Sequence, residues 1–566
     1  MNWCDASLAK RSMIPPAPRL KPGVLQSLSK RLWAAASAAA SAATVAAAAW
    51  AGSAPALALD VKASSVKLAS AYDPQTFDPH ALALLYHTRI THQIYESLVT
   101  RDAQYRIEPS LAVSWTNPSP TVWRFQLRAG VTFHDGSPFT ADDAAFSIER
   151  ALGPNSRRSF QLDGVKAARR IDPLTVDVQL AAPDAVFPEK LWLIGMMSKR
   201  WSEQYGVTAA QDFGAKQETH AARHANGTGP FKLLRYEPDV RTVLVRHEAW
   251  WGWKEARHGN VRRVEFTTIR SDATRVAALV SGEVDLVFDP PFQDIARLER
   301  DARLKVMRSP DIGQQYLVFD QARDELPGSD IKGRNPFKDR RVRQAVAHAI
   351  NLQALSDKVM RGYAQPSGAL LSSMVEGSLP ELNRPYAHDP EKARALLAQA
   401  GYPQGFSVAM SCVNISWREA VCQAVAAMLS QVGIRAALRT EPTSTFFPKL
   451  TAGQVSLAEF GWSPTPDAYF SLNALLHSYG PGGAGNFNAG RYRNPELDQL
   501  IEAVRNEVDL TRRRALVTTA LRLATDDLPM LPLFRRTVTW VMVKPVSAVQ
   551  WPSDLADLRF LRIQAP

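Results

Sequence analysis

Cysteine is scarce in this chain: its 566 residues include only Cys4, Cys412 and Cys422. So little cysteine excludes a small scaffold held together by several disulfides, and the length is sufficient for several domains with hydrophobic cores of their own. Long hydrophobic runs are also missing beyond Trp50, so the later part of the chain is not a polytopic membrane protein. No repeat of fixed period occurs, which excludes a solenoid.

Motifs for catalysis are missing as well. The chain has no serine-hydrolase elbow and no phosphate-binding loop. His80, His87 and His92 are separated by seven and five residues, spacings that do not place two imidazoles on one helix face as a zinc site requires. Residues 480–485 match the letters of a dinucleotide fingerprint, but a proline inside the match favours a loop. We therefore expect no catalytic residue, no metal and no cofactor.

Acidic residues are outnumbered, because 67 Lys and Arg face 55 Asp and Glu and give a formal charge of +12. The first 58 residues contribute six basic side chains and one acidic side chain to this excess. Elsewhere arginine and aspartate are interspersed rather than gathered into a basic stripe. We therefore do not expect a nucleic-acid partner.

An alanine-rich stretch at residues 32–58 follows Lys30 and Arg31 and ends with small residues at Ala56 and Ala58. This pattern is typical of a secretory signal, and we expect cleavage after Ala58. The alternative is a permanent membrane anchor, since residues 32–50 are nearly long enough to span a bilayer, but leucine is scarce there. No cysteine directly follows this stretch, so lipid attachment is not expected. The sequence predicts a soluble periplasmic protein.

Export would place Cys412 and Cys422 in an oxidising compartment. The sequence leaves two alternatives open for them: a single disulfide, or two small buried side chains.

Strand and helix patterns alternate along the rest of the chain. Residues 122–127 and 175–180 alternate apolar and polar side chains, which predicts two strands. Residues 339–355 and 390–400 carry apolar side chains at helical spacing, and Gly401 predicts the end of the second helix. The fold class is therefore α/β or α+β rather than all-α.

Several separated blocks then identify a family. The chain resembles the solute-binding proteins of bacterial ABC importers, specifically the peptide/nickel class called family 5. The matching blocks, in family order, are PSLA at 109–112, FHDG at 133–136, TADD at 140–143, GTGPF at 227–231, SGEVD at 281–285, DRRVRQA at 339–345, DPEKA at 389–393 and NPELD at 494–498.

The resemblance implies an α/β, two-lobed periplasmic binding protein fold (type II, cluster C) with an extra domain inserted in the first lobe. By this similarity, lobe I comprises 59–100, 222–310 and 533–566, the inserted domain 101–221, and lobe II 311–532. The implied function is capture of a peptide or peptide-like polar solute by hinge closure. Delivery to ABC importer permease subunits of the inner membrane would follow, by a monomer that performs no chemistry.

The ligand stays open among a peptide, a nickel chelate, heme, glutathione and an opine. The alternative function is an exported hydrolase acting on such solutes, which the missing nucleophile motif disfavours.

The resemblance also suggests where a ligand binds. In peptide-binding members, Gly-Trp is followed three residues after the Trp by an Asp that pairs with the ligand's ammonium group. Here Gly461 and Trp462 lead to Thr465, which carries no charge, so Asp467 is the candidate substitute if the loop is shifted. Trp462 is the main candidate for ligand contact because an indole offers an apolar face and an N–H donor; burial in the core is the alternative.

Five further candidates are weaker. Tyr72 and Tyr316 lie on segments that line the cleft in the family. Asn486, Asn488 and Arg491 follow the glycine-rich loop and are candidates to bind a carboxylate or carbonyl. Exposure to solvent is the alternative for Arg491.

Overall fold

The computed structural model describes residues 64–215, 217–463, 467–480 and 483–564. The predicted signal segment and its cleavage site after Ala58 lie outside these residues. Within the described ranges, no helix combines the length and the apolar character needed to cross a bilayer.

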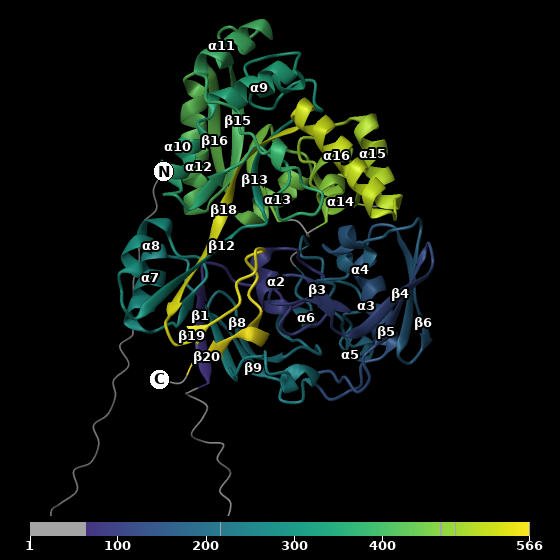
Figure 1. Ribbon diagram of the computed structural model, residues 1–566. Helices are drawn as coiled ribbons and strands as arrows, with labels where there is room; N and C mark the ends of the chain where they lie inside the picture. The colour runs from purple at the N-terminus through teal and green to yellow at the C-terminus, as the bar shows by residue number, and fades with distance from the viewer. Residues whose placement is uncertain (1–63, 216, 464–466, 481–482, 565–566) are drawn as a thin grey trace, which may run out of the picture. The chain divides into compact units, whose positions relative to one another are not determined.

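The largest sheet has twelve strands and contains both parallel and antiparallel pairs (Figure 1). Ten of them follow one another in the order β16 (Ile434–Glu441), β15 (Phe406–Val413), β17 (Leu457–Trp462), β13 (Gln314–Phe319), β18 (Met530–Val543), β11 (Leu286–Val287), β1 (Ser65–Ser70), β10 (Arg263–Thr268), β9 (Arg241–Arg246) and β8 (Phe231–Glu237). Two more strands, β12 (Leu304–Pro310) and β14 (Ala364–Pro366), pair with β18.

Strand β18 is shared by the two halves of this sheet. Its first part, up to Arg536, pairs with β13 and β14, and its second part, from Thr537, pairs with β12 and β11. We call β1 and β8–β12 lobe I, and β13–β17 lobe II. In the described residues the chain crosses between these strand sets at 311–313, between β12 and β13, and at Arg536–Thr537 inside β18.

These crossings lie close to the predicted boundaries after residues 310 and 532. The boundaries themselves stay a prediction.

A separate antiparallel sheet has the order β4 (Ala112–Ser119), β5 (Val122–Leu127), β7 (Thr175–Leu180) and β6 (Val165–Asp172). The strands predicted at 122–127 and 175–180 are confirmed as β5 and β7. Helix α3 (Ala141–Leu152) packs on β6 and β7. It begins after Thr140, whose backbone N–H donates to the Asp143 carboxylate at 2.9 Å, so one of the unpaired donors at the helix start is satisfied. We call residues 112–180, which contain this sheet, α3 and the segment between α3 and β6, the inserted domain.

The remaining strands and helices complete the fold. Two small sheets pair β2 (Val99–Arg101) with β3 (Ile107–Pro109) and β19 (Val546–Ser547) with β20 (Arg562–Ile563). The other helices are α2 (Leu85–Thr91), α4 (Phe187–Lys190), α5 (Lys199–Gln204), α6 (His220–Arg223), α7 (Asp272–Ser281), α8 (Phe292–Glu299), α9 (Arg340–Ala349), α10 (Leu352–Ala354), α11 (Pro390–Gln399), α12 (Ser416–Ser430), α13 (Thr443–Thr451), α14 (Ala468–Ser471), α15 (Pro495–Asn506) and α16 (Leu510–Asp527).

The predicted helix at 339–355 is wrong in one respect, because the structure divides it. Helix α9 ends at Ala349, and Ile350 takes an extended backbone conformation with φ −92° and ψ 119°. The Asn351 side chain then accepts from the Ala354 backbone N–H at 2.8 Å and caps α10. An asparagine that satisfies a new helix start stabilises the break, which apolar spacing alone does not reveal. The helix predicted at 390–400 is confirmed as α11, and Gly401 follows it with φ +88°, a conformation that favours glycine.

Candidate functional site

A cleft of about 2400 Å³ has walls from both lobes and the inserted domain. Lobe I contributes the loop after β1 and residues 288–293, and α2 lies beside them. Lobe II contributes the end of β17 and parts of α12 and α13. The inserted domain contributes residues 156–161, which include the first part of the 3₁₀ helix η1 (Ser159–Leu162). Pockets for drug-sized ligands measure roughly 300–1,000 Å³, so this cleft accommodates a larger solute.

The two chain crossings meet at the cleft through Asp311 and Arg536. The Arg536 guanidinium donates to the Asp311 carboxylate at 3.0 and 2.9 Å, and the Asp311 backbone N–H donates to the Arg536 carbonyl at 3.0 Å. Burial alone would lower the pKa of Arg536, but Asp311 and Asp554 raise it above its usual value. The pair therefore stays charged and connects the two crossing segments.

Four aromatic side chains form one wall of the cleft, and we call them the aromatic wall. Trp462, at the end of β17, stacks on Phe470 with ring centroids 5.4 Å apart and lies 4.5 Å from Phe487. Phe160 of η1 approaches from the inserted domain, 5.9 Å from Phe487. The Trp462 indole N–H donates to the Ser471 hydroxyl at 3.3 Å. Phe160, Phe470 and Phe487 are half-buried and offer apolar surface that a solute can cover, whereas Trp462 is only 8% exposed.

A buried ion pair joins α12 to β17 in lobe II. Arg418, on α12, donates to both carboxylate oxygens of Glu459 at 2.7 Å, and Glu459 on β17 is fully buried. Burial raises the pKa of Glu459 above its ordinary value, although Arg418 opposes the shift. Arg418 itself lines the cleft, so its charge is fixed in place by a carboxylate that no solvent reaches.

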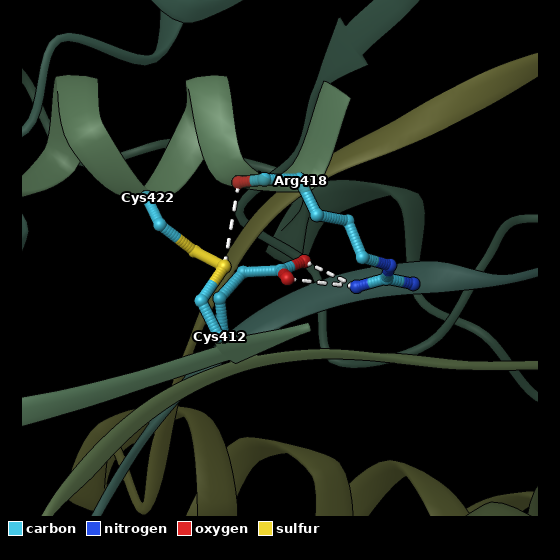
Figure 2. The surroundings of a disulfide bond; sticks show 4 residues. Cys412, Arg418 and Cys422 are labelled. Atoms are coloured by element: carbon cyan, nitrogen blue, oxygen red, sulfur yellow. Dashed lines mark hydrogen bonds and ion pairs between the residues drawn. A yellow bond between two sulfur atoms is a disulfide. The ribbon is translucent and has the colours of Figure 1, made fainter. Parts of the chain in front are cut away.

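A disulfide joins Cys412 of β15 to Cys422 of α12, which settles the alternative that the sequence left open. Arg418 lies between the two cysteines in the sequence, within the segment that this bond closes, and Figure 2 shows its side chain beside the disulfide. The Arg418 carbonyl oxygen is 3.4 Å from the Cys412 sulfur. The bond therefore fixes the start of α12, and with it Arg418, against the sheet.

The same residues are not a metal site. Among the described residues, one group of three has potential metal-ligand atoms within 4.8 Å of one another, and it consists of Cys412, Cys422 and Glu459. Both sulfurs belong to the disulfide and the carboxylate is paired with Arg418, so neither thiolate nor free carboxylate remains to hold an ion.

Tyr72, Asn486 and Trp462 are the predicted site residues that line the cleft. The Tyr72 ring stacks on Tyr86 with centroids 5.3 Å apart. Burial and the neighbouring Asp289 raise the pKa of Tyr72, so its hydroxyl keeps its proton and its capacity to donate a hydrogen bond. Ligand contact by each of the three stays a prediction.

Asp467 is placed differently from the expectation. Its carboxylate accepts two hydrogen bonds from the Arg513 guanidinium, at 2.7 and 2.9 Å, and both side chains are 7% exposed. It also caps α14 by accepting from the Tyr469 backbone N–H at 2.9 Å. Asp467 is not among the described residues that line the cleft, and its charge is already neutralised. Thr465, which prompted this substitute, lies outside the described residues.

Tyr316, Asn488 and Arg491 likewise do not occur among the described cleft-lining residues. The Tyr316 hydroxyl is buried and donates to the Leu370 carbonyl at 2.5 Å. The Asn488 amide donates to two backbone carbonyls. Arg491 donates to the Asn488 carbonyl at 3.1 Å and is only partly exposed. Each of these side chains contacts local structure, and ligand contact by them stays a prediction.

Sequence reasoning missed the arginines that line the cleft, among them Arg158, Arg418 and Arg536. No local motif distinguishes them from the other arginines of this arginine-rich chain. Arg536 lies in a long strand and Arg418 in the first turn of a helix. They are far apart in the chain, so no local spacing shows that they line one cleft.

Comparisons with known proteins now add to this geometry. Residues 106–483 match the model of the bacterial extracellular solute-binding proteins, family 5. The chain belongs to this family. Its predicted identity as a family 5 binding protein is thereby confirmed.

Individual relatives agree. The glutathione-binding protein GsiB of Shigella flexneri is 26% identical over 470 residues, which cover 81% of this chain and 86% of GsiB. Heme-binding protein A of Haemophilus influenzae is 27% identical over 479 residues, which cover 78% of this chain and 82% of the relative. Among solved structures, the periplasmic binding protein DppA of Helicobacter pylori in complex with peptide STSA has a TM-score of 0.77 and 23% identity, over 88% of this chain and 98% of DppA.

These findings support a two-lobed binding fold and a solute-binding role in ABC import. Members of the family bind solutes for transport and are not enzymes, so the hydrolase alternative is not supported.

Proposed function

We propose that this solute-binding protein captures a peptide or peptide-like polar solute in the periplasm and delivers it to the inner-membrane permease subunits of an ABC importer. The single observation that carries the proposal is the cleft of about 2400 Å³, whose walls come from both lobes. A solute in this position touches residues on either side of the two chain crossings.

Such a position couples binding to closure. A ligand shifts a conformational equilibrium only by the difference in its affinity for the two states. A solute that contacts Tyr72 in lobe I and Trp462 in lobe II makes its full set of contacts only when the lobes are closed. The permease would then recognise the closed form.

The chemistry of the cleft supports the proposed ligand class. The aromatic wall suits apolar groups, while Arg418 and Arg536, whose charges Glu459 and Asp311 already balance, suit neutral carbonyl groups. Glutathione and the tetrapeptide STSA, which two relatives bind by their printed names, both carry several carbonyl groups and a terminal carboxylate. Because Asp467 is paired with Arg513, recognition of a free ammonium group at Asp467 is not part of the proposal.

The proposal includes the route to the periplasm. The alanine-rich segment acts as a signal that is cleaved near Ala58, no lipid anchor remains, and the mature protein is a monomer. N-terminal sequencing of the protein exported from its host tests the cleavage site, and light scattering after gel filtration tests the monomer. A mature chain that still contains residues 32–50 would contradict this part of the proposal.

Native mass spectrometry of protein purified from its own periplasm tests the function directly. We expect a co-purifying small molecule, and thermal unfolding in the presence of that molecule, glutathione or STSA should then show stabilisation. A ligand at 100 times its Kd adds roughly 2.7 kcal/mol to the free energy of unfolding. A molecule that is recovered hydrolysed, with saturable turnover abolished by one substitution in the cleft, would favour the hydrolase instead.

A further inference from the structure

Buried arginines in this protein follow a pattern with one relevant exception. Nine arginines of the described residues are buried, and seven of them lie within 4 Å of a carboxylate. The other two, Arg158 and Arg535, have no carboxylate within 4 Å among the described residues. Of these two, only Arg158 lines the cleft.

The Arg158 side chain is held by neutral groups. It is 4% exposed, and its guanidinium donates to the Thr88 hydroxyl and, at 3.4 Å, to the Gln161 side-chain oxygen. Its Nε–H has no hydrogen-bond partner among the described residues. A buried cation with an unused donor is costly unless an anion completes it.

The surrounding ionisable groups do not supply that anion. Burial is the largest cause that lowers the pKa of each neighbouring histidine, His80, His87 and His92, and the positive charge of Arg158 lowers it further. They are therefore neutral at pH 7. Burial also lowers the pKa of Arg158 itself, to about 10, which leaves the guanidinium charged at neutral pH.

We infer that Arg158 is the binding site for a carboxylate of the transported solute, at the face of the cleft formed by the inserted domain. A guanidinium presents a planar fork of donors that matches the two oxygens of a carboxylate, and the Nε–H is one arm of this fork. The inference rests on the proposed function and adds to it: the solute is anionic at one end, and the aromatic wall, to which Phe160 belongs two residues further along the chain, receives an apolar part.

Matched pairs of probes test the carboxylate. The tetrapeptide STSA and glutathione are each compared with a form in which the C-terminal carboxylate is capped as an amide. We expect the wild type to bind the free acid at least tenfold more tightly than the amide. Arg158→Met should bind both forms equally weakly, and Arg158→Lys, which keeps the charge but not the fork, should be intermediate. Arg169→Met removes the same charge from an exposed position of β6 and should behave as the wild type.

Acetate tests the site without a larger ligand. At equal ionic strength, replacing chloride by acetate should raise the Tm of the wild type and of Arg169→Met but not that of Arg158→Met. If the wild type prefers the acids and Arg158→Met keeps that preference, or if acetate stabilises Arg158→Met as much as the wild type, the inference is overturned while the binding function stands. If acetate acts through Arg158 but neither probe binds the wild type, the Arg158 site is supported and the proposed ligand class fails.

Discussion

The disulfide between Cys412 and Cys422 gives the sharpest test of how the cleft wall of lobe II is built. Replacing both cysteines by alanine in Cys412→Ala/Cys422→Ala removes the bond between β15 and α12. Both sulfurs are fully buried, so the substitution leaves the surface of the protein unchanged. The start of α12, which carries Arg418, is then held only by hydrogen bonds and packing.

The expected loss follows from the length of the closed loop. The two cysteines are 10 residues apart in sequence, and closing a loop of that size removes unfolded-state entropy equivalent to about 3 kcal/mol at 25 °C. Because Arg418 lies inside this loop, looser placement of its guanidinium should also weaken ligand binding.

Urea unfolding of the oxidised wild type and of the double variant measures this difference. We expect a lower midpoint for the variant and a calorimetric Kd for the co-purified solute that is higher than the wild-type value. Reduced and alkylated wild type serves as the control for the alanine substitutions, since it lacks the bond but keeps the cysteines. Equal unfolding free energies of variant and oxidised wild type, or two free thiols in the denatured, unreduced wild type, would refute the reasoning.

Three further predictions concern Trp462, Asp467 and Glu96. Trp462→Ala should remove most of the ligand-induced rise in Tm while the circular dichroism spectrum stays that of the wild type; an undiminished rise would exclude Trp462 from the site. Asp467→Asn should lower the free energy of unfolding by roughly 3–5 kcal/mol, because it leaves the buried Arg513 unpaired, yet keep the Kd within twofold; a tenfold weaker Kd would return Asp467 to the binding site. Burial raises the pKa of Glu96 to about 7, above its unfolded value, so the folded state binds this proton more tightly. The stability that Glu96 contributes should therefore be present at pH 4 and fall by on the order of 3 kcal/mol by pH 8. Glu96→Gln should lack this fall in urea unfolding, and parallel pH profiles of the two proteins would contradict the assignment.

Local patterns in the sequence predicted local structure well. The strands β5 and β7 and the end of α11 at Gly401 all follow from alternation or turn chemistry within a few residues. The break between α9 and α10 was missed because apolar spacing continues across it, while the decisive interaction is the cap formed by Asn351. A polar side chain that interrupts a helix acts locally, but here the apolar spacing on both sides of it predicts a continuous helix.

The candidate site was only partly predictable, because its residues are brought together by long-range pairing. Trp462 was found through a motif and lines the cleft, whereas Asp467 belongs to the same motif and faces Arg513, 46 residues later in the chain. No residue near Asp467 in the sequence indicates that Arg513 is its partner. Arg158 differs from Asp467 because it has no oppositely charged partner in the part of the chain that the structure describes. The lack of a carboxylate near Arg158 becomes visible only when all of its neighbours in the structure are known.

The geometry of β18 limits where closure can occur. Backbone hydrogen bonds hold β18 to β13 and β14 on one side of Arg536 and to β12 and β11 on the other, so each half moves as a unit with its lobe. Rotation must then be absorbed at Arg536–Thr537 and at 311–313, which the ion pair of Asp311 with Arg536 keeps together. The free energy for closure has to come from contacts that a solute makes only in the closed state, and each tenfold gain in affinity for that state supplies about 1.4 kcal/mol. A solute that reached Arg158 and the aromatic wall at once would contribute such contacts from opposite sides of these crossings, because Arg158 belongs to the inserted domain and Trp462 to lobe II.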